Sequence, residues 1–107
     1  MPQYAIIADH TPLTCPGSSK SAARHAQEAL GKRMPELAEK LGVEVQLNVH
    51  LDPSHKSLLL VEAPNAEAVR DLIFDSGFLQ FNNMDFYLVQ PIADLIQRSQ
   101  DWERPFE

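Results

Sequence analysis

Hydrophobic and polar residues alternate along several stretches of this chain in the patterns typical of strands. A first strand is predicted over Gln3 to Asp9, where Ile and Ala fill both faces. The cleanest alternation of period two runs from Val43 to Leu51, with a polar face formed by Glu44, Gln46, Asn48 and His50. Lys56 to Ala63 supplies a returning strand after turn residues 52–55, and Met84 to Val89 a last one.

Two stretches of helical periodicity lie between these strands. From Lys20 to Leu41, apolar residues recur at helical spacing after an N-cap at Ser18 or Ser19, although Pro35 predicts a kink or break just before it. A second helix is predicted from Ala66 to Ser76, ended by a glycine. A short helix from Ile92 to Ser99 leads into the polar tail that holds Trp102 and Phe106.

The order of these elements, β-α-β-β-α-β, predicts a ferredoxin-like α+β fold, with a four-stranded antiparallel sheet and both helices on one face. With 107 residues the chain is expected to form one domain over residues 1–97, followed by a tail over residues 98–107. With both helices on one face, the other face of the sheet has no cover, and the leucines at 58–60 make it apolar. We therefore expect dimerisation through the sheet.

In its size, its element order and its apolar sheet, the chain resembles the dimeric α/β-barrel superfamily, in which two ferredoxin-like subunits pack sheet to sheet. The resemblance covers nearly the whole chain and implies a homodimer. That superfamily includes monooxygenases without a cofactor, isomerases and haem-linked enzymes. The resemblance therefore implies no single reaction.

Composition and charge exclude several classes of function. The net charge of −6 and the pI near 5.1 disfavour binding to nucleic acid or to an anionic membrane surface. No apolar stretch is long enough to span a bilayer. The single cysteine excludes a disulfide framework and indicates a cytoplasmic protein, and the scattered glycines indicate that no nucleotide cofactor is bound.

Polar side chains are expected to gather at one edge of the predicted sheet. We expect the first and third strands to lie side by side and parallel, so that His10 at the end of the first lies near Glu62 at the end of the third. The start of the fourth strand brings Asn82 and Asn83 to the same edge. Cys15 joins them from the following loop, just before a helix N-terminus that favours the thiolate.

Two functions are compatible with this cluster. The first is a small-molecule-handling homodimer with a pocket near the loop from His10 to Ser19. There Cys15 is the thiolate, His10 the base or orienting group, and the substrate-binding groups are Glu62, Asn82 and Asn83. The alternative is a non-catalytic module that binds a metal ion or ligand through His10, Cys15 and Glu62. The sequence does not decide whether the chain is an enzyme.

The other histidines are expected to lie away from this cluster. His55 and Glu62 are seven residues apart along one extended strand, which is about 23 Å, so they do not share a two-histidine, one-carboxylate site. We expect His50 and His55 at the hairpin end of the sheet, opposite His10, with His55 in a solvated turn. His25 is expected on the flank of the first helix. On this interpretation the four histidines do not form one site.

Overall fold

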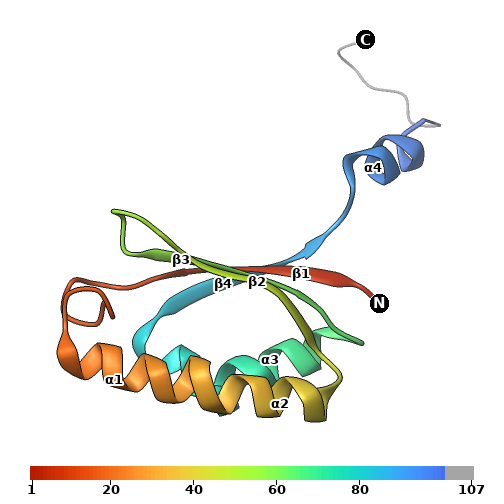
Figure 1. Ribbon diagram of the computed structural model, residues 1–107. Coiled ribbons are helices and arrows are strands. Elements are labelled where there is room, and N and C mark those ends of the chain that lie inside the picture. The colour runs from red at the N-terminus through yellow and green to blue at the C-terminus, as the bar shows by residue number, and fades with distance from the viewer. Residues whose placement is uncertain (101–107) are drawn as a thin grey trace.

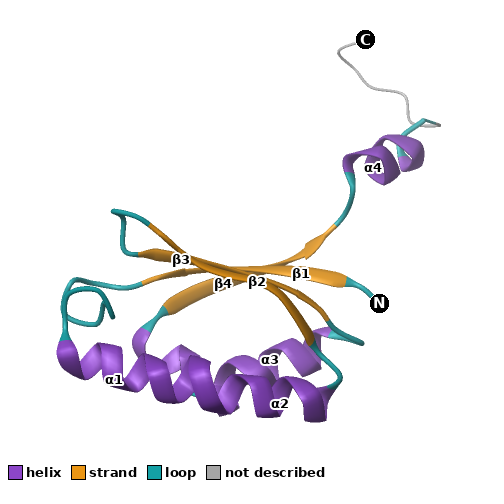
Figure 2. Ribbon diagram, viewed as in Figure 1, coloured by secondary structure: helices purple, strands orange, loops and turns teal. Residues whose placement is uncertain are grey.

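The computed structural model describes residues 1–100 and has two layers, a four-stranded sheet and a set of helices beneath one of its faces (Figures 1 and 2). The strands are β1 (Gln3–Asp9), β2 (Glu44–Leu51), β3 (Lys56–Glu62) and β4 (Asn83–Val89). The helices are α1 (Lys20–Glu28), α2 (Met34–Leu41), α3 (Ala66–Ser76) and α4 (Ile92–Arg98). The predicted α+β class and the four-stranded antiparallel sheet are confirmed.

The sheet has the strand order β2-β3-β1-β4, and every neighbouring pair is antiparallel. The prediction that the first and third strands run parallel is therefore wrong. Gln3 pairs with Glu62 and Asp9 with Lys56. The physical reason is the tight hairpin, which makes β3 antiparallel to β2, while the helical crossover leaves β1 parallel to β2. Because β3 lies between them, it runs opposite to both.

The helix ends follow the local sequence signals. Ser19 caps α1, where its side chain accepts a hydrogen bond from the Ala22 N–H, so the predicted capping serine is confirmed. The expected break before Pro35 is a short π-helical segment, Ala29–Arg33, after which α2 begins with the proline in its first turn. Gly77 ends α3 in the left-handed conformation that glycine adopts without strain.

The core lies between the sheet and the helices. Its largest fully buried side chains come from both layers, because alternate strand residues and the apolar stripe of α3 face each other. They are Phe78, Ile6, Leu59, Leu72, Val61 and Val69. Phe78 belongs to a 3₁₀ turn, Phe78–Phe81, that joins α3 to β4.

A bulge in β2 changes which residues face this core. Val45 pairs with the buried Val61, but the register then shifts, so that Leu47 pairs with Leu60 and Asn48 with the buried Leu59. Beyond the shift, Leu47 and the alternate apolar residues that follow it face the uncovered side of the sheet. Asn48 and His50 face the helix layer. The prediction of one continuous polar face on this strand is therefore wrong.

The sheet face opposite the helices has no cover from the described part of its own chain. The last helix, α4, stands away from the body of the molecule on that side (Figure 1). None of its residues is buried. No helix within the described residues is long and apolar enough to cross a membrane.

Candidate metal centre

Cys15 is fixed in place by the loop between β1 and α1. Its carbonyl oxygen accepts hydrogen bonds from the N–H groups of Ser18 and Ser19, at 3.1 and 3.0 Å, while the Ser18 hydroxyl donates to the Pro12 carbonyl at 2.8 Å. The loop turns back on itself, and the cysteine side chain is only 4% exposed. The thiol is therefore directed into the protein.

His10 and His55 extend the pairing of β1 and β3 by one residue. The His10 N–H donates to the His55 carbonyl at 2.9 Å, immediately beyond the last strand pair, Asp9 with Lys56. The two imidazole rings meet edge to face, with their centroids 5.6 Å apart. The antiparallel register therefore places two histidines side by side at the end of the sheet where the Cys15 loop begins.

The hydrogen bonds of Asn82 determine which nitrogen of His10 carries a proton. The buried Asn82 amide donates from Nδ2 to the Phe78 carbonyl at 3.2 Å, which turns its Oδ1 toward His10. That oxygen lies 2.9 Å from His10 Nδ1 and can only accept. His10 Nδ1 is therefore the protonated donor, and in the neutral ring Nε2 carries a lone pair.

His50 is oriented in the same way. Its Nδ1 lies 2.5 Å from a carboxylate oxygen of Asp52, to which it donates. Its Nε2 then faces two other groups: it lies 3.3 Å from His10 Nε2 and 3.7 Å from Cys15 Sγ. Each of the two rings is thus held at Nδ1 by an oxygen acceptor, and both present Nε2 to one point beside the thiol. Such outer partners are typical of histidines that bind metal ions.

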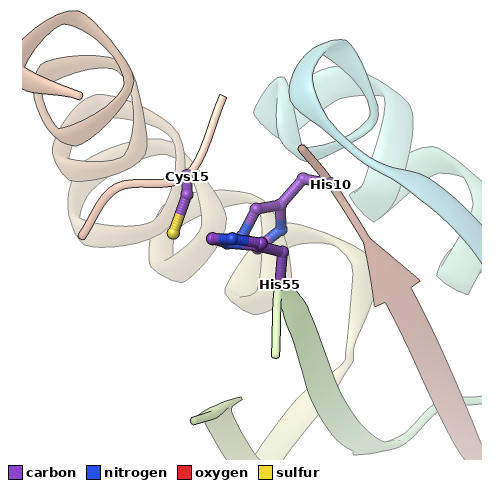
Figure 3. A group of neighbouring side chains, drawn as sticks. All are labelled: His10, Cys15 and His55. Carbon is purple, nitrogen blue, oxygen red and sulfur yellow. The ribbon is translucent and has the colours of Figure 1, made fainter. Parts of the chain in front are cut away.

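His55 adds a further donor. One donor atom from each of His10, Cys15 and His55 lies within 4.8 Å of the others, and Figure 3 shows the three side chains meeting from separate segments of the chain. The Nδ1 atom of His55 is buried and has no hydrogen-bond partner. A buried polar atom without a partner is costly, and a metal ion or an ordered water supplies one.

Two of the separations between these donor atoms match the geometry of a four-coordinate metal. In a tetrahedral zinc site with bonds of about 2.05 Å to nitrogen and 2.3 Å to sulfur, neighbouring nitrogens are ~3.3 Å apart and a nitrogen and a sulfur ~3.6 Å. The separation of His10 Nε2 from His50 Nε2 is 3.3 Å, and that of His50 Nε2 from Cys15 Sγ is 3.7 Å. Two edges of such a tetrahedron are therefore already formed.

Beside this cluster a cleft of about 480 Å³ opens between the sheet and the helix layer. His10 and His50 form part of its wall, and apolar side chains such as Leu30 and Phe81 line the rest together with the buried Phe78. This volume suits a small molecule. Cys15 is not among the residues that line the cleft.

The comparisons with known proteins bear on the fold. No protein-family model matches this chain, and the comparison with curated proteins gave no match. A solved structure of similar fold is the crystal structure of SCO4226 from Streptomyces coelicolor A3(2), with a TM-score of 0.52 and 16% sequence identity. The match covers 82% of this chain and 96% of that chain. At this identity the likeness shows a small α+β fold and nothing about function.

The structure brings together part of the cluster expected from sequence. His10, Cys15 and Asn82 meet, as the contacts above show, and Asn83 lies next to them opposite Asp9 with its side chain exposed. Glu62 does not join them. Because it pairs with Gln3, it lies at the other end of β1, about 23 Å from His10 along the strand. The expected third ligand, Glu62, is therefore in the wrong place.

Two histidines that were expected elsewhere, His50 and His55, lie beside His10, where Glu62 was predicted. The prediction that they sit at the opposite end is therefore wrong. His55 lies in a turn, as predicted, but it is half-buried and its Nδ1 is shielded from solvent. His25 stays apart, with its Nε2 3.2 Å from the Gly77 carbonyl. The signal that identifies this site is the antiparallel register, which brings the residue after β1 next to the residue before β3.

Proposed function

We propose that this protein binds a transition-metal ion through Cys15 and three histidines, His10, His50 and His55. The observation that carries the proposal is the 3.3 Å approach of the Nε2 atoms of His10 and His50. Both rings use Nδ1 as the donor to an oxygen, so in their neutral forms both Nε2 atoms present lone pairs to each other. Two lone pairs at this distance repel unless a cation or a proton lies between them.

A single thiol proton does not satisfy this arrangement. If Cys15 donates its proton to His50 Nε2, the lone pair of His10 and the buried Nδ1 of His55 remain without a partner. One metal ion held by a thiolate and imidazole nitrogens satisfies all of them at once. The metal-binding proposal therefore accounts for more of the polar atoms than a network of protons does.

The donor set selects the class of metal. Imidazole and thiolate ligands suit zinc, copper, nickel, cobalt and iron, whereas calcium and magnesium prefer oxygen ligands in larger numbers. A thiolate and three imidazoles in tetrahedral array favour zinc or cobalt among divalent ions. We place the protein in the reducing cytoplasm, where the single cysteine stays available as a thiolate.

We further propose that the chain has the ferredoxin-like fold of the dimeric α/β-barrel superfamily and forms a homodimer through the open sheet face. The strand order β2-β3-β1-β4 supports the fold, since it leaves β3 between the parallel pair β1 and β2. Apolar side chains on the uncovered face support the dimer. Leu47, Val49 and Leu51 are each about 40% exposed there.

The test is a titration of the metal-free protein with Co²⁺, whose visible spectrum reports tetrahedral geometry and whose near-ultraviolet charge-transfer band reports a thiolate ligand. We expect one Co²⁺ per chain with both signatures. Cys15→Ser should abolish the charge-transfer band, and His10→Ala or His50→Ala should weaken binding about 100-fold or more. His25→Ala is the matched control, because this histidine lies outside the cluster. Glu62→Gln is a second control, because the strand register places Glu62 at the other end of β1, away from the proposed ligands.

Absence of stoichiometric Co²⁺ binding, or equal affinity in the His10 and His25 variants, contradicts the metal proposal.

The second candidate function is thiol chemistry on a small molecule, which the cleft beside His10 and His50 favours. The metal-free sample of the same titration tests it by alkylation with iodoacetamide. A reactive nucleophile is modified within minutes at neutral pH, whereas the burial of Cys15 predicts slow modification.

A further inference from the structure

The helix α4 carries an apolar stripe that the rest of the described chain leaves exposed. Ile92, Leu95 and Ile96 recur at the spacing of one helix face and are 68, 47 and 56% exposed. The opposite face is polar and holds Asp94 and Gln97. A helix of seven residues is far below the length that is stable alone in water, so this helix needs a surface to pack on.

In the structure this helix does not pack on the sheet of its own chain. Only Gln90 and Pro91 connect β4 to α4, and Pro91 has an extended backbone, with φ −57° and ψ 140°. Two residues span at most about 7 Å, and Figure 1 shows α4 beyond the end of β4. The Cα radius of gyration, 16.6 Å, likewise exceeds the value of about 13 Å expected for a compact domain of this length.

A suitable surface exists on the same side of the molecule. The uncovered face of the sheet presents an apolar band across its strands, which consists of Leu47, Val49, Leu51, Leu58, Leu60 and Tyr87. The apolar stripe of the helix and the apolar band of the sheet therefore both need to be covered, and every copy of the chain carries both surfaces. In a two-fold dimer every such contact occurs twice, so that two copies satisfy each other.

We propose that α4 is an exchanged arm, which packs its Ile92, Leu95 and Ile96 stripe on the open sheet face of a second copy of this chain. The inference rests on the proposed homodimer, and it specifies that α4 of the partner, and not the partner's sheet, covers the apolar band. The charge of the helix argues for a protein surface over a membrane. Its one basic residue, Arg98, is balanced by Asp94, whereas helices that bind membrane surfaces are rich in Lys and Arg.

Sedimentation equilibrium of the full-length chain tests the arm. We expect the wild-type protein to be a dimer at micromolar concentration, and Leu95→Asp and Ile96→Asp each to raise the dimer Kd about 100-fold. Gln97→Asp adds the same charge to the opposite face of the same helix and should leave the Kd unchanged. Because all three positions are exposed, none of these changes disturbs the core.

If the wild type is a dimer and the Leu95 and Gln97 variants have equal dimer Kd values, the proposal of an exchanged arm is wrong, while that of a homodimer is supported. A wild-type monomer at micromolar concentration overturns both. Hydrogen exchange gives an independent reading. The α4 amides should be protected in the dimer and lose that protection on dilution to monomer, and full exchange of α4 in the dimer contradicts the arm.

Discussion

At the scale of single residues, the proposed metal centre depends on Asn82 as much as on the proposed ligands themselves. Its carbonyl oxygen accepts from His10 Nδ1 and so keeps Nε2 free to bind a metal. We expect Asn82→Ala to lower the affinity for Co²⁺ by about 10–100-fold without removing a ligand. Competition with a chelator of known affinity measures the change.

Asn83 provides the matched control for this experiment. It is the same residue type one position further along, but its side chain is exposed and points to the other face of the sheet. Asn83→Ala should leave the affinity for Co²⁺ within about twofold of the wild type. Equal losses in the two variants would show that the hydrogen bond to His10 has no part in binding.

At the scale of elements, the turn after α3 connects the helix layer to the proposed metal centre. Gly77 adopts φ +92°, and a Cβ there would lie 3.2 Å from a guanidinium nitrogen of Arg33. The 3₁₀ turn that follows supplies the Phe78 carbonyl that orients Asn82. We expect Gly77→Ala to lower the free energy of unfolding by about 1–2 kcal/mol, measured by urea denaturation.

Gly31 is the comparison for this change, because a Cβ added there meets no atom within 4 Å. It lies in the π-helical segment, at a backbone conformation that alanine tolerates. Gly31→Ala should leave the free energy of unfolding unchanged or raise it by up to about 1 kcal/mol. A Gly77 variant as stable as the Gly31 variant would contradict the argument from backbone strain.

The elements themselves were largely predictable from sequence because their ends carry local signals. Ser19, Asn65, Gly42 and Gly77 each act at a helix terminus through a side-chain hydrogen bond or a left-handed backbone. The bulge in β2 has no such signal. The alternation of apolar and polar residues continues from Val43 to Leu51 without a break, while the backbone slips by one residue after Val45. Which face His50 occupies was therefore not predictable from periodicity.

The candidate site was predictable only where it depends on neighbours in sequence. His10 and Cys15 are five residues apart in one loop, and their proximity follows from the chain itself. The other ligands depend on strand direction. The assumption that the first and third strands run parallel placed Glu62 beside His10, whereas the antiparallel register places His55 there. The error in strand direction thus placed Glu62 at the candidate site, where the structure has His50 and His55.

At the scale of the whole molecule, the proposed metal joins segments that are far apart in the sequence. The ligands come from the first loop, the end of β2 and the turn before β3, so a bound ion ties the Cys15 loop to the β2–β3 hairpin. The site needs the folded arrangement of these segments. Binding therefore stabilises the native state, because the unfolded chain does not hold the four donors together.

This coupling predicts the thermal stability of the protein. At a free metal concentration of 100 times the Kd, the stabilisation is about 2.7 kcal/mol, which corresponds to a rise of roughly 10 °C or more in Tm for a chain of this length. We expect this rise on adding Zn²⁺ to the wild type and to His25→Ala, but not to Cys15→Ser. Calorimetry at two protein concentrations separates the effect of metal from that of association, since Tm rises with concentration only in a dimer. An equal response of the Cys15 and His25 variants to Zn²⁺ would mean that the ion binds elsewhere, because only one of the two side chains belongs to the proposed centre.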